Sequence, residues 1–180
     1  MATNDWPAER RAYLYGVACL RRYWDELSAT ERAAVEAVER FAELEATKGD
    51  LWTARRAVPD GGRLAEAARH LTYTYRTGSN YSDIRRQLVE LARDRSDGPG
   101  AAAEQSAHDK LLTDISGRPM SWVFDPRWRT PTVEPIAASI YAARAFDQIP
   151  ILADAVEDAG CDAADLLAHL RGTGPHARGC

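Results

Sequence analysis

The sequence has no long apolar run and few lysines. No stretch approaches the roughly 18 consecutive apolar residues of a membrane span, and we expect no leader segment. Of the 23 basic residues only Lys48 and Lys110 are lysine, and the rest are arginine. The formal charge is −4 at pH 7. A net negative charge argues against a generic polyanion binder, so we expect neither a membrane nor nucleic acid among the partners.

Cysteine is also scarce. The chain contains Cys19, Cys161 and Cys180, an odd number spread widely along the sequence. This pattern excludes the disulfide framework of a small secreted protein and predicts a reducing, cytoplasmic location. A chain of 180 residues buries roughly 70% of its unfolded surface, so it needs no disulfide to fold.

What the sequence does contain is helical periodicity. Apolar residues recur at spacings of three and four from Tyr13 to Leu27, and Ser28 with Glu31 forms a capping box that starts a second helix. Similar stripes follow to the C-terminus, without an internal repeat. We predict an all-α protein, a single compact multi-helix domain over residues 1–180 with one long ordered loop at 117–132. The charged, Gly- and Pro-containing segment 94–100 predicts a linker and a possible subdivision into 1–94 and 101–180. The residues expected to be buried are Leu20, Trp24, Val38, Ile140 and Ile151.

The loop at 117–132 is rich in large side chains. Trp122 lies beside Val123 and Phe124, which predicts that it is buried, whereas Trp128 lies between Arg127 and Arg129. Tryptophan and arginine are enriched among binding hot spots. The sequence therefore predicts that Trp128 is the more exposed tryptophan and that Trp128, Arg127 and Arg129 form a partner-binding surface.

Four soft or borderline metal ligands lie within the last 20 residues: Cys161, His169, His176 and Cys180. Two thiolates and two imidazoles can hold zinc tetrahedrally. The spacing differs from that of common zinc fingers. A small capped Cys161, two solvent-facing histidines and a free terminal thiol remain the alternative interpretation.

Signatures of catalysis are weak. The segment Gly172-Thr173-Gly174 follows a helix, whereas a phosphate-binding loop precedes one. Cys19 lies in an apolar stretch, where a cysteine is more often a small buried side chain than a nucleophile. We therefore expect no catalytic residues, and the protein is more readily interpreted as a non-enzyme.

Several stretches resemble an uncharacterised bacterial family of planctomycete-type proteins. They are 17–24 (VACLRRYW), 34–42 (AVEAVERFA), 111–119 (LLTDISGRP), 125–133 (DPRWRTPTV) and most of 140–180, including AFDQIPILADAVEDAGC and AHLRGTGPHARGC. The family pattern has cysteine where this chain has Leu170, and it continues beyond the final Gly-Cys. The resemblance implies a helical protein with a distinctive C-terminal module and implies no reaction.

Two functions fit these observations. The first is a non-catalytic protein-binding or accessory module without a cofactor, whose partner is an unidentified protein. The alternative is a zinc-stabilised module, with Cys161, His169, His176 and Cys180 as ligands, that binds protein or nucleic acid. Metal content discriminates between the two.

Overall fold

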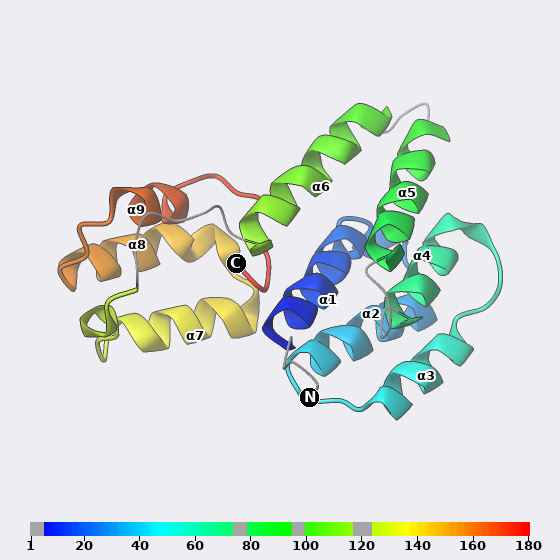
Figure 1. Ribbon diagram of the computed structural model, residues 1–180, viewed down its shortest axis with the longest axis horizontal. Coiled ribbons are helices and arrows are strands. Elements are labelled where there is room, and N and C mark those ends of the chain that lie inside the picture. The colour runs from blue at the N-terminus through cyan, green and yellow to red at the C-terminus, as the bar shows by residue number, and fades with distance from the viewer. Residues whose placement is uncertain (1–5, 74–78, 95–99, 117–123) are drawn as a thin grey trace.

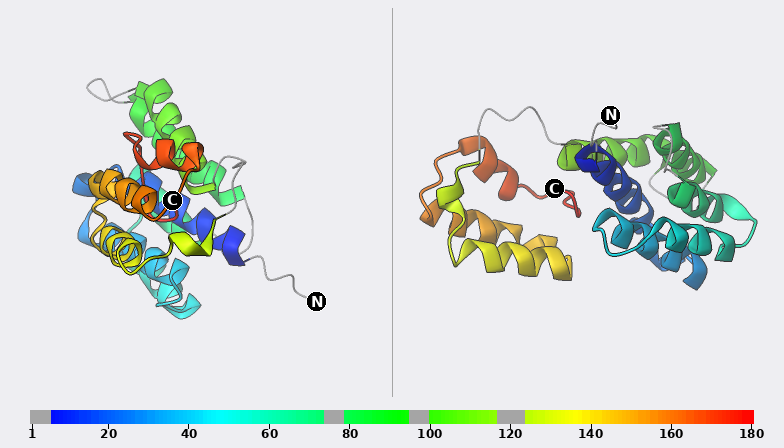
Figure 2. Two further views of the ribbon diagram at one scale, coloured as in Figure 1. Left: turned by 90° about the vertical axis from the view of Figure 1, so that its left-hand side faces the viewer. Right: turned by 60° about the horizontal axis from the view of Figure 1, so that its bottom comes forward.

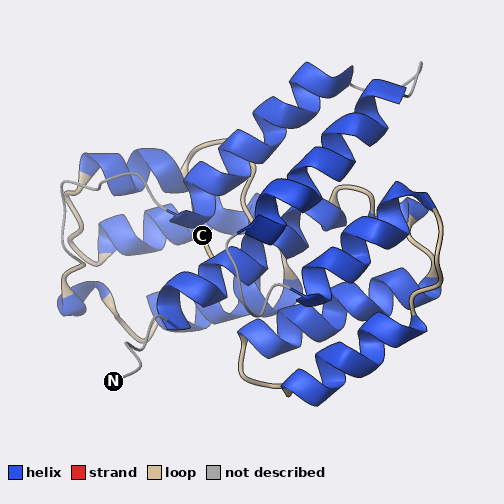
Figure 3. Cartoon of the chain, turned by 45° about the vertical axis from the view of Figure 1, so that its right-hand side comes forward, coloured by secondary structure: helices blue, strands red, loops and turns tan. Residues whose placement is uncertain are grey.

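The computed structural model describes residues 6–73, 79–94, 100–116 and 124–180 (Figure 1). All regular structure in these ranges is helical, which confirms the predicted all-α fold (Figure 3). Three short 3-10 turns accompany the α-helices, at Trp24–Glu26, Pro126–Trp128 and Phe146–Gln148. The α-helices are α1 (Trp6–Arg21), α2 (Ala29–Ala42), α3 (Lys48–Ala57), α4 (Gly62–Tyr73), α5 (Ser79–Asp94), α6 (Gly100–Ser116), α7 (Val133–Ala143), α8 (Ile149–Asp158) and α9 (Ala164–Leu170).

Local sequence sets several helix starts. The predicted capping box at α2 is confirmed: the Glu31 N–H donates to Ser28 Oγ at 3.3 Å, and the Ser28 N–H donates to the Glu31 carboxylate at 2.6 Å. Thr47 and Asp50 form the same reciprocal arrangement at α3. Each pair satisfies backbone donors that the first turn of a helix leaves without a partner.

Helices α1 to α6 form one packing unit, which we call the N-terminal bundle. Its core gathers the apolar stripe of α1 with residues of α2, α3, α4, α5 and α6, and the predicted core residues Leu20 and Val38 are fully buried. Trp24 is only partly buried. It lies in the 3-10 turn beyond the end of α1, where the Arg21 guanidinium is 4.4 Å from the ring centre. Because α1 ends at Arg21, residue 24 no longer continues the apolar face of that helix toward the core.

Helices α7 to α9 form a second unit with its own core, which we call the C-terminal unit (residues 124–170). Ile140 is buried as predicted, but the prediction for Ile151 is wrong, since 56% of that residue is exposed. The inner face of α8 runs through Ile149, Ala153 and Val156, spaced by four and three. This phase turns Ile151 outward.

The two units lie side by side and are joined by the tail, residues 171–180, which runs from α9 back to α1 and α6 (Figure 2). Ala177 in the tail packs against the core of the N-terminal bundle. The predicted division at 94–100 falls between α5 and α6, and both of these helices pack in the N-terminal bundle. The separation between the two cores lies beyond α6 instead.

Buried charge also joins the two units. Glu39 of α2 is 2% exposed and accepts from Arg21 of α1 at 2.6 Å and from Arg144, which follows α7, at 3.2 Å. Arg178 of the tail lies 3.5 Å from the same carboxylate. Beside it, the Tyr141 hydroxyl donates to Glu43 at 2.5 Å. Groups from α2, α7 and the tail therefore meet at this boundary.

No helix in the described ranges is both long and apolar enough to cross a membrane. Of the predicted loop, residues 117–123 lie outside the described part, and so does the prediction that Trp122 is buried. The same holds for residues 95–99 of the predicted linker. Residues 124–132 contain the 3-10 turn Pro126–Trp128 and lead directly into α7.

Candidate metal centre

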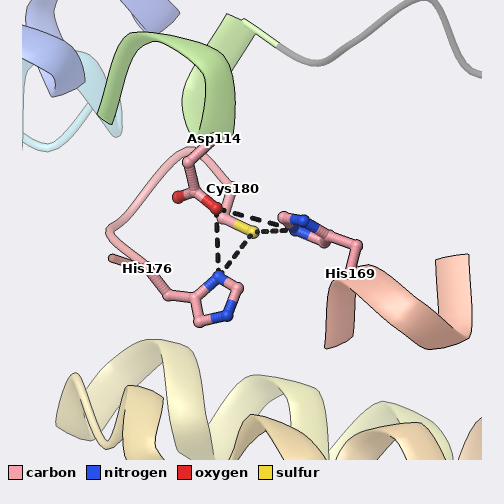
Figure 4. Close-up of side chains that lie close together, drawn as sticks. All are labelled: Asp114, His169, His176 and Cys180. Carbon is pink, nitrogen blue, oxygen red and sulfur yellow. Dashed lines mark hydrogen bonds and ion pairs between the residues drawn. The ribbon is translucent and has the colours of Figure 1, made fainter. Parts of the chain in front are cut away.

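Four potential metal ligands converge where the tail meets the N-terminal bundle (Figure 4). Asp114 comes from the last turn of α6 and His169 from the end of α9. His176 and Cys180 come from the tail, and their side chains point back toward the other two. The centre therefore draws on both packing units and on the segment that connects them.

The ligand atoms lie close to the separations that a tetrahedral ion needs. His169 Nε2 is 3.1 Å from Cys180 Sγ and 3.6 Å from Asp114 Oδ1. His176 Nδ1 is 3.0 Å from Asp114 Oδ1 and 3.8 Å from Cys180 Sγ. All four atoms lie within 4.8 Å of one another. Bonds of about 2.0–2.3 Å to zinc place neighbouring ligands of a tetrahedron about 3.3–3.8 Å apart, so the set fits with small adjustments.

Groups behind the ligands hold them in place. The second ring nitrogen of His176, Nε2, lies 3.2 Å from the Gly172 carbonyl oxygen, which leaves Nδ1 directed at the centre. The second carboxylate oxygen of Asp114 accepts from the Ala177 N–H at 3.2 Å. Ligating histidines and carboxylates are commonly oriented by such contacts, which fix the tautomer and the ring angle.

Two glycines allow the tail to reach this position. Gly174 has a φ of +79°, and a Cβ added there would lie 2.7 Å from the His176 backbone nitrogen. Gly179 has a φ of +101°, and its Cβ would lie 3.1 Å from side-chain carbons of both Leu14 and Ile115. A side chain at Gly179 would thus push the tail off the N-terminal bundle, away from Asp114.

The electrostatics of the site keep the Cys180 thiol protonated in the absence of a metal ion. Burial, together with the neighbouring Asp114 carboxylate, raises the pKa of the Cys180 thiol to about 12. A divalent ion that replaces the thiol proton would remove this repulsion. The donor set of one thiolate, two imidazoles and one carboxylate consists of ligand types that zinc accepts.

The structure brings together three of the four predicted ligands. Cys161 is absent from the cluster, because it is 4% exposed in the core of the C-terminal unit, where its N–H donates to the Val156 carbonyl at 3.1 Å. Asp114 takes the fourth position. Sequence spacing missed this residue since it lies 55 positions before His169 on another helix, and a single aspartate at a helix end has many ordinary explanations.

The sequence predicts that Trp128 is more exposed than Trp122, which lies outside the described residues, and the structure shows that Trp128 itself is buried. Trp128 is 7% exposed and belongs to the core of the C-terminal unit, where Phe124 meets it edge to face at 5.6 Å. The 3-10 turn that begins at Pro126 directs the indole inward, and burying that large apolar area outweighs the polarity of its neighbours. Arg127 and Arg129 are exposed and pair with Asp125 at 2.6 Å and Glu134 at 3.1 Å.

Comparisons of the chain with protein families, with curated proteins and with solved structures find no match. The resemblance to a planctomycete-type family therefore stays a prediction, and any function has to be inferred from the site itself.

Proposed function

We propose that this protein is a zinc-stabilised, non-catalytic accessory module in which one zinc ion fastens the C-terminal unit to the N-terminal bundle. The observation that carries the proposal is the convergence of Asp114, His169, His176 and Cys180, with ligand atoms at near-tetrahedral separations. Asp114 belongs to one packing unit and His169 to the other. A bound ion would therefore add a link between the two cores beside the Glu39 network.

A closed set of four protein ligands is typical of structural zinc sites, whereas catalytic sites use three protein ligands and a water. The ion would supply folding free energy by holding α9 and the tail against α6. A reducing cytoplasm, which the unpaired cysteines favour, would keep the Cys180 thiol available for the metal. The accessory role of the module, toward a protein partner, is the expectation that the sequence supports; Arg127 and Arg129 remain the candidate contact residues, without Trp128.

The test is the metal content of protein purified without a chelator. Wild-type protein is expected to contain one equivalent of zinc. His176→Ala and Asp114→Asn each remove a ligand and so weaken zinc binding by roughly tenfold or more. After purification each variant is expected to contain less than about a tenth of an equivalent of zinc.

Cys161→Ser is the matched control for Cys180→Ser, since both remove a thiol from the same 20 residues. Loss of zinc in Cys180→Ser, with full zinc in Cys161→Ser, supports the site as the structure places it. Loss in Cys161→Ser with retention in Asp114→Asn would overturn it in favour of the ligand set predicted from the sequence. Wild-type protein that takes up no zinc when the ion is supplied in excess would overturn zinc binding altogether.

A further inference from the structure

The metal centre does not lie in a sealed interior. A cleft of about 600 Å³ runs between α6 and the α9–tail segment, and Asp114, His169 and His176 form part of its wall. Cys180, the fourth ligand, does not line this cleft. The face of the ligand tetrahedron formed by Asp114, His169 and His176, opposite the thiolate, therefore borders the cleft, and Cys180 is itself an exposed residue.

We infer that the centre takes a small oxyanion, a carboxylate or phosphate group, as a fifth ligand that enters from this cleft opposite Cys180, with Lys110 as its charge partner. The inference rests on the proposed zinc site. Zinc can expand from four to five ligands when an external group approaches an open face. The step is a coordination event only: no bond within the anion breaks, and no proton is transferred.

Lys110 is placed for this role by the geometry of α6. Ser106, Lys110 and Asp114 are spaced by four, so they follow one another along the cleft-facing side of the helix. Lys110 is exposed, and it forms no ion pair within the described residues. Among the residues that the structure describes, it is also the only lysine or arginine that lines the cleft. An ammonium one turn from a zinc ligand can donate to an oxyanion that is bound to the metal.

The acidic residues of the cleft leave room for an anion. Asp109 accepts from Arg85 at 2.7 Å, so its charge is already paired outside the centre. Asp165 also lines the cleft, on the α9 side. The ion, the Lys110 ammonium, the two ligand anions Asp114 and Cys180, and Asp165 together make the metal-loaded site neutral before an anion enters. The hydroxyl group of Thr173 adds a donor along the wall, whereas the Thr113 hydroxyl already donates to the Asp109 carbonyl at 2.9 Å.

The experiment uses the full chain with Co²⁺ in place of zinc, because cobalt reports its coordination by absorption. Charge-transfer absorption reports the Cys180 thiolate, and the intensity of the d–d bands falls when four ligands become five. The Co²⁺ protein is titrated separately with inorganic phosphate and with acetate at constant ionic strength. Wild type is compared with Lys110→Ala and with Lys48→Ala, which alters the chain's other lysine, on α3.

We expect a saturable fall in d–d intensity with the charge-transfer band retained, because the thiolate lies opposite the entering anion. Lys110→Ala should lower the affinity for the anion by about tenfold, the value of one charge-assisted hydrogen bond. Lys48→Ala should bind the anion as tightly as wild type. If only phosphate or only acetate lowers the d–d intensity, and Lys110→Ala weakens that effect, the inference is supported and the class of anion is identified.

A d–d spectrum that neither anion alters, or an affinity that Lys110→Ala leaves unchanged, would overturn the inference. The proposed zinc site fails in a different way, since Co²⁺ would then not bind or would show no thiolate charge transfer. Protein that binds Co²⁺ with the thiolate band yet ignores both anions keeps the zinc site and loses only the fifth ligand.

Discussion

Gly174 shows how much one residue contributes to the metal centre. Its backbone has a left-handed φ of +79°, and the space that a Cβ would need is occupied by the His176 backbone nitrogen. Gly174→Ala must therefore shift the very turn that aims His176. We expect the variant to bind zinc at least about tenfold more weakly, as for the loss of a supporting contact behind a ligand, measured by competition with a chromophoric chelator.

Gly160→Ala is the control for backbone strain. Gly160 also has a positive φ, +90°, but a Cβ there would meet nothing within 4 Å. This variant is expected to lose some stability and to keep the zinc affinity of wild type. Equal zinc affinities for Gly174→Ala and wild type would show that the turn can adapt and that its close approach is not needed for the site.

Trp128 gives a second prediction at this scale, which reverses the expectation from the sequence. Because the indole is buried in the C-terminal unit, Trp128→Ala should cost about 3–5 kcal/mol in free energy of unfolding, the range for removing a buried aromatic. Urea unfolding measures it. Trp52→Ala is the matched control, since Trp52 is 60% exposed beside Arg56, and should cost less than about 1 kcal/mol. Similar costs for the two variants would contradict the burial of Trp128.

At the scale of elements, an ion pair joins Arg22, the residue after α1, to Glu104 of α6, and the carboxylate of the pair is buried. Arg22 Nη2 lies 2.8 Å from the Glu104 carboxylate, and His108, one turn later on α6, has its Nε2 2.9 Å from the same group. Burial alone would raise the pKa of Glu104, but the contacts with His108 and Arg22 outweigh it and lower that pKa to about 2. The helices are thus held together by a carboxylate that stays ionised well below its ordinary range.

The sign of the pH dependence follows from this shift. A carboxylate with a pKa lower in the folded chain stabilises it fully above the unfolded value of about 4.3, and this stabilisation disappears as the pH falls toward 2. Glu104 should contribute on the order of 3 kcal/mol to that acid loss. Urea unfolding between pH 5 and about 2 should show a shallower decline for Glu104→Gln than for wild type. Glu36→Gln, on the exposed surface of α2, is the control and should decline as steeply as wild type. An equally steep decline for Glu104→Gln would contradict a lowered pKa of Glu104.

Helices were more predictable than the centre they support. The Ser28–Glu31 capping box and the stripe of α1 act through neighbours three and four residues away, so the sequence shows them directly. Trp24 and Ile151 depend on where a helix ends and on the phase of its inner face, which are decided by packing between helices. Asp114 depends on the path of the whole tail, so no local spacing indicates it. Cys161 has the chemistry of a ligand, and only its burial in the other core excludes it from the cluster.

At the scale of the whole molecule, two sets of interactions help to hold the C-terminal unit against the N-terminal bundle. One is the proposed zinc centre, and the other is the Glu39 network, which connects α2 to Arg144 and to Arg178 of the tail. Burial alone would raise the pKa of Glu39, and the hydrogen bond from Arg144 and the charge of Arg21 lower it instead. Glu39 is therefore ionised at neutral pH, where it can hold these arginines whether or not metal is present.

We therefore expect the metal to increase the stability of the arrangement in which the C-terminal unit is docked on the N-terminal bundle. An ion that binds only the docked arrangement stabilises it by about 2.7 kcal/mol when its free concentration is 100 times its Kd. Hydrogen exchange resolved by peptide should show α7, α8 and α9 exchanging faster after zinc is removed, while α3 and α4, which lie on the side of the N-terminal bundle away from the C-terminal unit in Figure 1, should not change.

Combining this measurement with variants separates the two sets of interactions. Asp114→Asn should exchange at the metal-free rate whether or not zinc is added, and Glu39→Gln should exchange faster than wild type yet still respond to zinc. The double variant should be the fastest in α7–α9, because the metal centre and the Glu39 network are then both lost, while the Glu43–Tyr141 hydrogen bond remains. Exchange in α7–α9 that is indifferent to zinc in wild type and in Glu39→Gln would mean that the C-terminal unit stays docked without the ion. The metal would then lose the fastening role that its position between the two cores suggests.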